Sequence, residues 1–363
     1  MKDKLLSFLK SQLKSIILII VALICSFAAA AVVLLFAGYN PVEAFESILA
    51  GAIGSRTAIA QSFGKATPLM ILGISVAVAF KGSSFNIGAE GQFYAGALGA
   101  VLCEMALHNS GLPSAAIITL CLLSAFLLGA VWGMIPGYLK ASRGASEVVT
   151  TVMLTSVILL LVGFLVSQGG PIAEPRGIYP ETQEIVESAR LPYIWKGTRL
   201  HLGFAIALAV VAASYFFLEK TTGGYKIKAT GLNPNAAAYG GISVGMVTIS
   251  TMMLSGAIAG LAGGVEVLGT SWKLYVNLSP GYGYNAIAVA LLGRLSPIGI
   301  VFSALLFGML NTGCNQMARY IGIPNTIAAV IQALVLLFVV GFSILENKTF
   351  SLKLKKKGGT VCE

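Results

Sequence analysis

The chain has 363 residues, of which 56% are apolar and 10% are charged, whereas soluble domains have roughly 45–50% apolar and 25% charged residues. This composition excludes a water-soluble enzyme and indicates an integral membrane protein. Glycine supplies 42 of the 363 residues, whereas an average usage of about 7% would give far fewer. A high glycine content is typical of helices that pack closely in lipid. The net charge of +10 is concentrated at the chain ends and in short gaps between apolar runs. It therefore indicates membrane topology rather than a nucleic-acid-binding patch.

The N-terminal segment predicts a retained transmembrane helix. Four lysines, Lys2, Lys4, Lys10 and Lys14, precede the apolar run Ser15–Gly38. A secretory signal peptide has a shorter apolar core of about 7–15 residues followed by a cleavage site. We therefore expect this run to span the membrane with the N-terminus in the cytoplasm.

Eight further apolar runs are candidate spans: Ala66–Phe80, Phe85–Leu107, Pro113–Leu139, Val148–Val166, Leu202–Leu218, Met246–Leu268, Tyr284–Leu310 and Ile323–Leu345. Nine spans would leave the C-terminus outside, yet the tail is rich in lysine, which favours the cytoplasm. Within Tyr284–Leu310, the sequence from Gly293 to Pro297 supplies a charge and a helix breaker, so we predict two short spans joined by a tight cytoplasmic turn. The predicted fold is therefore an all-α polytopic membrane protein of about ten helices, some broken or short, with both termini cytoplasmic.

The distribution of charged and apolar residues divides the chain into three parts. We expect a cytoplasmic segment 1–14, a transmembrane domain 15–345 and a basic cytoplasmic tail 346–363. Two external loops are predicted, Tyr39–Lys65 and Gln168–Leu200. The second mixes acidic and basic residues with four prolines, which favours an ordered loop without long helices. It is either a solvated cap or a docking surface for an external partner.

The sequence carries no recognisable catalytic constellation. It has no phosphate-binding loop, no HExxH and no nucleophile motif. The five cysteines lie far apart without a CxxC pair, so neither a disulfide framework nor a metal site is predicted. His108 and His201 lie at segment ends, where solvated side chains are expected. If ATP drives transport here, another chain must hydrolyse it.

The stretch Ser84–Tyr94 interrupts an apolar run with polar residues. Asn86, Glu90 and Gln92 need partners or water, because an unpaired polar group in hydrocarbon costs several kcal/mol. Glycines in the same stretch permit a broken helix, which is a feature of substrate paths in transporters. The alternative is that Glu90 braces neighbouring helices.

Two sets of glycines recur every fourth residue: Gly129, Gly133 and Gly137, and Gly256, Gly260 and Gly264. This spacing clears one helix face for close approach of a neighbouring helix. We interpret both sets as packing residues, and tightly packed helices of this kind can slide or rock between two arrangements.

The cytoplasmic loop 220–245 contains the sequence GLNPNAAAYGGI, residues 231–242. Asn233 and Pro234 predict the cap and the first position of a short helix. Three alanines and a tyrosine on that helix would form a small, flat surface suited to docking on another protein. A plain connector is the alternative.

Together, FNIGAEGQ, GLNPNAAAYGGI, SGAIAGLAGGVEVLG and GYGYNAIAVALLGRLSPIGI resemble the permease subunit of a bacterial ABC importer. The superfamily is the branched-chain amino acid and ribose type, and the resemblance is closest to nucleoside-importer permeases often labelled as "simple sugar". It extends from about Thr67 to Leu345, while the N-terminal helix and the tail add little.

The resemblance implies a half-transporter in the bacterial cell membrane. Its expected partners are a second homologous permease, cytoplasmic ATPase subunits that hold ATP and Mg, and an extracytoplasmic substrate-binding lipoprotein. This chain would carry no cofactor, metal or catalytic residue. The family's coupling loop matches Gly231, Asn233, Ala236, Ala237, Gly241 and Ile242, which would contact the ATPase.

The resemblance favours a nucleoside substrate that passes between the two permeases. The proposed path residues are Phe85, Asn86, Glu90, Gln92, Tyr282 and Asn285, which offer hydrogen bonds and aromatic faces. A ribose-like monosaccharide would fit the same side chains. A secondary transporter driven by an ion gradient is a further alternative, although Glu90, Glu104 and Glu266 are the only carboxylates within the predicted spans.

Overall fold

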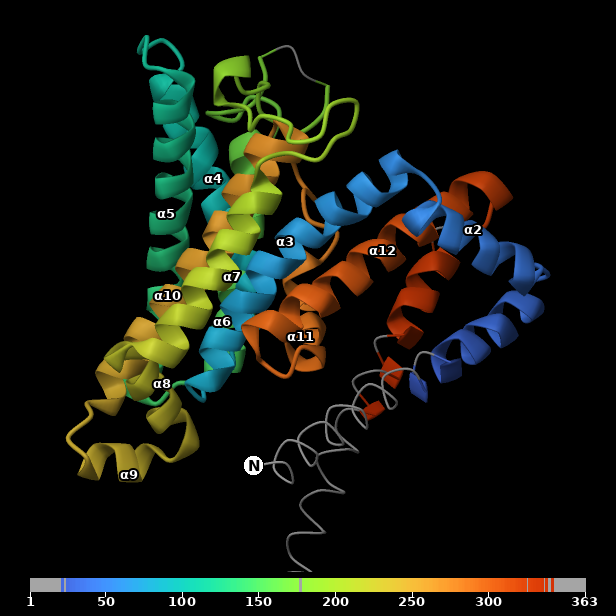
Figure 1. Ribbon diagram of the computed structural model, residues 1–363. Coiled ribbons are helices and arrows are strands. Elements are labelled where there is room, and N and C mark those ends of the chain that lie inside the picture. Colours follow the sequence, from blue (N-terminus) through green and yellow to red (C-terminus); the bar gives the residue numbers. More distant parts are fainter. Residues whose placement is uncertain are drawn as a thin grey trace, which may run out of the picture. The chain divides into compact units, whose positions relative to one another are not determined.

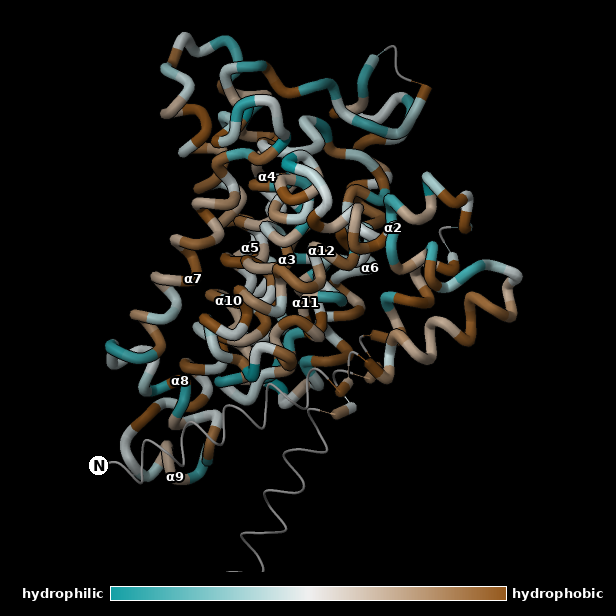
Figure 2. The backbone as a smooth tube through the Cα atoms, turned by 45° about the vertical axis from the view of Figure 1, so that its right-hand side comes forward, coloured by the Kyte–Doolittle hydropathy of each residue, from teal (hydrophilic) through white to brown (hydrophobic). Residues whose placement is uncertain are grey.

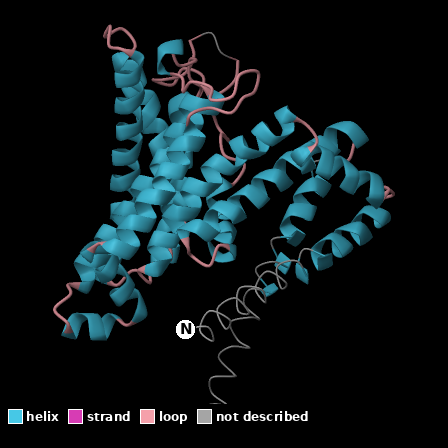
Figure 3. Cartoon of the chain, viewed as in Figure 1, coloured by secondary structure: helices cyan, strands magenta, loops and turns pink. Residues whose placement is uncertain are grey.

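The computed structural model describes residues 21–22, 24–175, 178–324, 326–335, 337–338 and 341–342. The predicted segment 1–14, the start of the first apolar run and the basic tail 346–363 lie outside the described residues. Over the ranges given above, every regular element is a helix, and β pairing is limited to three isolated bridges (Figure 3). The all-α prediction is thus confirmed for this part of the chain.

The helices follow one another through short connections, apart from one long loop. In chain order they are Ile24–Phe36, α2 (Pro41–Ile53), α3 (Arg56–Lys81), α4 (Ala89–Leu107), α5 (Ser114–Arg143), α6 (Glu147–Val166), the short 3-10 helix η1 (Glu187–Ala189), α7 (Gly203–Lys220), α8 (Thr222–Leu232), α9 (Pro234–Tyr239), α10 (Val244–Glu266), the π-helical turn η2 (Val267–Ser271), α11 (Tyr282–Leu292), α12 (Pro297–Ile321) and Thr326–Val335.

Among the described residues, six helices are long and apolar enough to cross a membrane: α3, α5, α6, α7, α10 continued through η2, and α12. Apolar residues run along the helices, and hydrophilic residues gather at loops and helix ends (Figure 2). The structure therefore supports a multi-pass membrane protein, and the count of ten spans stays a prediction.

The predicted split of Tyr284–Leu310 is confirmed. The helix α11 ends at Leu292 and α12 begins at Pro297. Between them, Arg294 and Leu295 adopt positive φ angles of 54° and 55°, and the Leu295 N–H donates to the Ala290 carbonyl at 2.8 Å. The sharp turn results because proline favours the first position of a helix and cannot continue the preceding one.

The prediction that Tyr39–Lys65 is a loop is wrong, because α2 and the first turns of α3 occupy this region. The Asn40 side chain caps α2 by accepting a hydrogen bond from the Val42 N–H at 3.0 Å, and Pro41 occupies the first helical position. An asparagine cap followed by proline strongly favours the start of a helix. The hydropathy criterion missed them because this region mixes charged and apolar residues.

Contacts divide the described chain into two compact units. The first contains the described residues up to Ala58 and those from Leu310 onward, and the second is Ile59–Met309. In the first unit, the Phe27 and Phe45 rings meet edge to face at 5.3 Å between centroids. In the same unit, Gly51 lies so close to Gln316 that a Cβ atom at position 51 would be 2.6 Å from the Gln316 Cβ.

The second unit is built around α10, which packs most extensively against α5 and α4. In α3, 78% of the most apolar stretch is buried, whereas in α6 the value is 22%. Outward-facing apolar side chains on α6 include Met153, Leu160 and Phe164. Because these side chains face away from the bundle, we assign them to contact with lipid or with another membrane-embedded chain. The short helices α8 and α9 lie at one end of this unit and the 168–200 loop at the other (Figure 1).

The predicted ordered loop without long helices is confirmed. Residues 168–175 and 178–202, together with 272–278, form a structure that we call the loop cap. Antiparallel bridges join Ala173 to Thr182 and Glu181 to Tyr275. The Ile185 N–H donates to the Trp272 carbonyl at 2.9 Å. The loop is therefore ordered by backbone pairing with the segment that follows α10.

Candidate functional site

The second unit contains a break between α3 and α4, which we call the α3–α4 link (residues 82–88). Helix α3 ends after Lys81, and Ser83 has a positive φ of 54°. Phe85 extends outward with 51% of its surface exposed and contacts Phe80 edge to face at 5.3 Å between centroids. The predicted interruption of the apolar run is therefore a real gap between two helices.

Asn86 is fully buried, and its hydrogen bonds fix the conformation of the α3–α4 link. Its amide nitrogen donates to the Gln92 Oε1 at 2.7 Å and to the Ser255 Oγ at 2.8 Å, and its Oδ1 accepts from the Gly88 N–H at 3.1 Å. Ser255 in turn exchanges hydrogen bonds with Ser75. One asparagine therefore connects α3, α4 and α10 through satisfied polar groups, as burial away from water requires.

Two glycines of the same motif allow α6 to approach. A Cβ atom at Gly88 would lie 2.8 Å from the Thr151 Cβ, and one at Gly91 would lie 2.7 Å from the Thr155 Cα. No ordinary side chain fits at these distances. The motif therefore combines polar residues that hold the break with glycines that admit the neighbouring helix.

Glu90 lies in the first turn of α4 and contacts the start of α11. Its Oε2 accepts from the Gly283 N–H at 2.6 Å, and Gly283 is so close to the Glu90 backbone that a Cβ atom would collide with it. Nearby, the Tyr94 hydroxyl oxygen accepts from the Ser279 N–H at 3.0 Å. Three of the proposed path residues, Asn86, Glu90 and Gln92, are thus buried and hydrogen-bonded within the chain.

The other proposed path residues lie on α11 and on the α3–α4 link. Tyr282 is buried, and its hydroxyl accepts from the Lys65 Nζ at 3.0 Å. Asn285 is half-buried, and neighbouring Tyr284 is 46% exposed. The structure therefore brings Glu90 and Tyr282 together, whereas Phe85 lies exposed on the link.

Lys65 is a residue that the sequence analysis missed. It was assigned to an external loop, but it lies in α3 with its ammonium 5.7 Å from the Tyr282 ring centroid. A lysine directly before an apolar run normally marks topology, so nothing in its local sequence distinguishes it from a loop residue.

The predicted short helix in the 231–242 loop is present as α9. The Asn233 side chain accepts from the Ala236 N–H at 3.1 Å, and Pro234 occupies the first helical position. Gly241 has a positive φ of 80°, which ends the turn. On α9, Ala236, Ala238 and Tyr239 are exposed, whereas Ala237 is only 5% exposed and faces the protein. Asn233 and Gly241 are also exposed, and Ile242 is half-buried.

Gly231, at the end of α8, packs against the α3–α4 link. Its Cα approaches the Lys81 carbonyl so closely that a Cβ atom would collide with that oxygen. Glu219 at the end of α7 pairs with Lys228 at 3.0 Å and with Lys81 at 3.9 Å. Helix α8 therefore packs directly against the end of α3.

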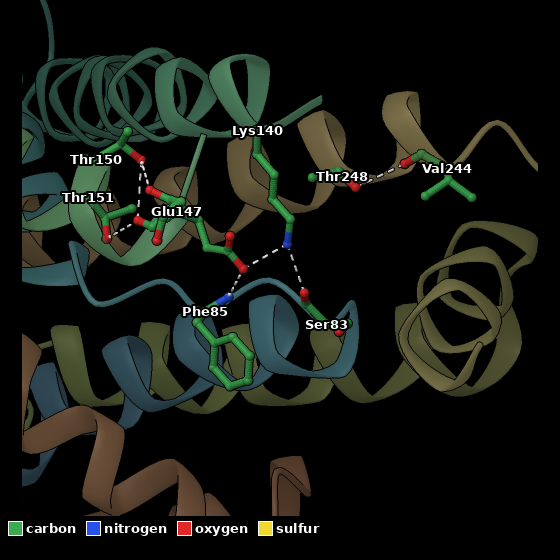
Figure 4. Close-up of polar contacts among 9 residues, drawn as sticks. Ser83, Phe85, Lys140, Glu147, Thr150, Thr151, Val244 and Thr248 are labelled. Carbon is green, nitrogen blue, oxygen red and sulfur yellow. Dashed lines mark hydrogen bonds and ion pairs between the residues drawn. The ribbon is translucent and has the colours of Figure 1, made fainter. Parts of the chain in front are cut away.

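An ion pair faces the same link from the other side (Figure 4). The Lys140 Nζ, at the end of α5, lies 2.7 Å from the Glu147 Oε1, at the start of α6. The same ammonium donates to the Ser83 carbonyl at 3.0 Å, and the same carboxylate accepts from the Phe85 N–H at 3.3 Å. The pair therefore contacts the backbone of the link as well as joining two helices.

The two glycine sets face each other, forming what we call the glycine seam: Gly129, Gly133 and Gly137 of α5, and Gly256, Gly260 and Gly264 of α10. A Cβ atom at Gly133 would lie 2.8 Å from the Gly256 Cα, and one at Gly260 would lie 2.8 Å from the Gly129 Cα. The backbones of α5 and α10 are thus in direct contact, with no side chain between them. Gly137 and Gly264 extend the contact to Met252 and Ala125, respectively.

His201 is buried at the base of the loop cap, so the prediction of a solvated histidine is wrong for this residue; His108 is exposed as expected. The His201 Nδ1 accepts from the Gly203 N–H at 3.1 Å, which leaves Nε2 to donate to the Thr270 hydroxyl at 3.1 Å. Burial lowers the pKa of His201 to about 4, so the imidazole is neutral at physiological pH. The signal that sequence analysis lacked is the pairing of the loop with η2.

Nothing in the described part of the chain resembles a metal site, because no group of three or more His, Cys, Asp or Glu side chains converges there. The arrangement is instead that of a helical membrane protein with one broken helix and one exposed short helix at the end of the bundle.

Comparison with known proteins identifies the family. Residues 58–340 match the family described as the permease component of the branched-chain amino acid transport system. The chain is 33% identical over 353 residues to the guanosine ABC transporter permease protein NupP of Bacillus subtilis, covering 96% of this chain and 99% of that protein.

Two further relatives extend the comparison. The nucleoside ABC transporter permease protein NupB of Lactococcus lactis is 34% identical, covering 93% of this chain and 94% of that protein. The glucose ABC transporter permease protein TsgB13 of Haloferax volcanii is 30% identical, covering 93% of this chain and 90% of that protein. No solved structure matches the chain. The chain therefore belongs to the branched-chain amino acid transport permease family of ABC transporters and is a multi-pass protein of the plasma membrane.

Proposed function

We propose that this chain forms half of the translocation path of an ATP-driven importer for nucleosides. The observation that carries the proposal is the similarity, over nearly the full length, to permeases named for guanosine and for nucleosides. In the proposed complex, a second homologous permease completes the path, a cytoplasmic ATPase binds ATP and Mg, and an extracytoplasmic lipoprotein delivers the substrate.

The side chains around α4 and α11 suit a neutral solute with hydroxyls and a flat base. Asn285 and Tyr284 are partly accessible, and they offer an amide and an aromatic face. Asn86, Glu90 and Gln92 already have partners inside the chain, so we assign them to holding the broken helix beside the path. Tyr282, Phe85 and Asn285 complete the proposed set.

The proposed ATPase contact is the exposed surface of α9. Gly231 and Ala237 pack inward and would shape the loop, while Asn233, Ala236 and Gly241 would lie at the contact, with Ile242 beside them. Exposed apolar side chains support this role, since Leu232 is 88% and Tyr239 is 95% exposed. The proposed contact would put the α9 end in the cytoplasm and the loop cap outside, as the predicted ten spans with cytoplasmic termini require.

A substrate screen tests the proposed cargo. The proposed substrate-binding lipoprotein is titrated with guanosine, adenosine, uridine, ribose and glucose, and uptake of the tightest ligand is measured in proteoliposomes that contain the full complex. Nucleoside binding with ATP-dependent uptake would support the proposal. A monosaccharide substrate is the second candidate, because one relative is named for glucose, and sugar binding without nucleoside binding would establish it. Uptake that persists without ATP and disappears with an ionophore would contradict both.

A pair of tryptophan substitutions tests the α9 contact. Ala238→Trp adds bulk to the exposed face of α9 and should abolish co-purification of the ATPase and uptake, because an apolar docking face tolerates little added volume. Ile178→Trp, at a position that is 88% exposed in the loop cap, is the matched control and should leave the ATPase bound. Ala237→Trp is less informative, because that side chain faces the protein.

A further inference from the structure

We propose that Lys140 and Glu147 are positioning residues for transport. Their hydrogen bonds fix the α3–α4 link, so that a displacement of α8 and α9 is transmitted through the link to the start of α4. The inference rests on the proposed function, since it concerns how an ATPase bound at α9 would act on the path. It assigns a role to an ion pair that only the structure reveals.

The first support is where the pair makes contact. Its two members come from α5 and α6, yet each also binds the backbone of the α3–α4 link (Figure 4). The Lys140 and Glu147 side chains are only 27% and 13% exposed. Partly buried charges interact more strongly than charges in open water, and charge-assisted hydrogen bonds are roughly twice as strong as neutral ones. The pair is therefore placed to restrain Ser83 and Phe85.

The second support is what lies on either side of the link. Toward α9, Gly231 of α8 presses on the Lys81 carbonyl, and a Cβ atom at Gly82 would lie 3.3 Å from the Ile227 Cγ2. Further along the link, Asn86 donates hydrogen bonds to Gln92 and Ser255. We therefore infer that a displacement of α8 is passed to the link, which contains Asn86.

The third support is a group of unsatisfied hydroxyls in the same region. Ser84, Thr230 and Thr251 are buried and, in the described structure, have no hydrogen-bond partner. Thr251 also lies directly against Gly82. A buried hydroxyl without a partner is unfavourable, so an arrangement of α8, the link and α10 that pairs these groups would compete with this one. This is the property expected of an element with two discrete states.

The test measures coupling rather than transport alone. The complete complex is reconstituted in proteoliposomes, and solute uptake and ATP hydrolysis are recorded together. For Lys140→Ala and Glu147→Ala, the number of solute molecules taken up per ATP should fall by at least about tenfold, the effect of losing one charge-assisted hydrogen bond. The complex should still assemble and hydrolyse ATP. Lys140→Arg, which keeps the donor and the charge, should retain coupling.

A charge swap separates the proposal from a merely structural ion pair. In Lys140→Glu combined with Glu147→Lys, the two side chains can still pair. However, a glutamate at position 140 cannot donate to the Ser83 carbonyl, and a lysine at position 147 cannot accept from the Phe85 N–H. The swap should therefore stay uncoupled. Glu184→Gln, which removes the Arg190 ion pair in the loop cap, is the matched control and should couple normally.

A second measurement covers the case in which a variant does not assemble. The native cysteines of the complex are replaced, and Phe85→Cys is introduced with Lys140 and Glu147 left intact. The new cysteine is then labelled from the α9 side by a membrane-impermeant maleimide. Its labelling rate should differ between the ATP-bound and nucleotide-free states. An unchanged rate, wild-type coupling in both alanine variants, or restored coupling in the swap would each overturn the inference. Absence of ATP-dependent uptake by the wild-type complex would instead refute the proposed function.

Discussion

The glycine seam and the loop cap are both well ordered, but by opposite means. In the seam, α5 and α10 touch backbone to backbone because glycine leaves no side chain between them. In the loop cap, backbone hydrogen bonds, ion pairs and a contact of Arg190 with the Trp272 ring, 4.3 Å from its centroid, order the chain. The membrane helices of the seam are thus held together by close packing, whereas the loop cap is held together by hydrogen bonds and ion pairs.

This difference has a consequence for what disturbs each region. Close packing depends on volume and is insensitive to pH and salt. Polar pairing tolerates changes in volume but depends on protonation and ionic strength. The following predictions test this contrast.

The largest effect is expected from adding one methyl group to the seam. Gly260→Ala would place its Cβ against the Ala125 carbonyl and 2.8 Å from the Gly129 Cα, so the two helices must separate. We expect a loss of at least about 3 kcal/mol in the free energy of unfolding, measured by denaturation in detergent. Gly163→Ala in α6 is the matched control. A Cβ there meets nothing within 4 Å, so helix propensity should stabilise it by up to about 1 kcal/mol. Equal effects of the two changes would disprove the role of the seam.

Acid should weaken the loop cap through His201. Its pKa of about 4 in the folded chain lies below the value of about 6.5 expected after unfolding. The unfolded chain therefore binds the proton first, and the contribution to stability is complete above pH 6.5 and disappears as the pH falls toward 4. The full loss is about 3 kcal/mol, measured as the free energy of unfolding against pH.

The control for this prediction is the second histidine. His201→Gln should remove the pH dependence between 6.5 and 4, whereas His108→Gln, at an exposed position, should leave it unchanged. A wild-type stability that is flat across this range would show that His201 is not held neutral by burial.

The buried Asn86 tests whether the helix bundle also depends on polar pairing. Asn86→Ala removes the partner of the Gln92 amide and one of the hydrogen bonds of Ser255, which should cost about 2 kcal/mol in the free energy of unfolding. Asn315→Ala removes an exposed hydrogen bond to Asn311 and should cost less than about 0.5 kcal/mol. If the two variants lose the same stability, packing alone explains the bundle.

The smallest effect is expected at the surface of the loop cap. Lys273 pairs with Glu181 at 3.0 Å, and this hydrogen-bonded carboxylate raises the pKa of Lys273, so the lysine stays charged near neutral pH. Lys273→Met should cost less than about 1 kcal/mol. The difference from wild type should shrink in 1 M salt, where charges are screened over about 3 Å. A difference that is independent of salt would show that packing of the lysine stem, rather than charge, matters.

Local sequence was sufficient for several elements. Long apolar runs predicted the membrane helices, the Asn233–Pro234 cap predicted α9, and Pro297 predicted the split between α11 and α12. Hydropathy did not predict α2, because a helix with mixed polarity has no apolar signature. The polar motif at Asn86 identified the broken helix, although its partner Ser255 lies 169 residues away in the sequence.

By itself, the sequence determined that this is a polytopic membrane protein, where its helices break and which family it belongs to, because these properties depend on composition and on short local patterns. Only the tertiary structure decided that the two glycine sets face each other, that Lys65 meets Tyr282 and that His201 is buried. Only the tertiary structure likewise placed Lys140 and Glu147 on the α3–α4 link. Each of these contacts joins residues on different elements, and in glycine-rich apolar helices the sequence does not distinguish the face that packs from the face that meets lipid.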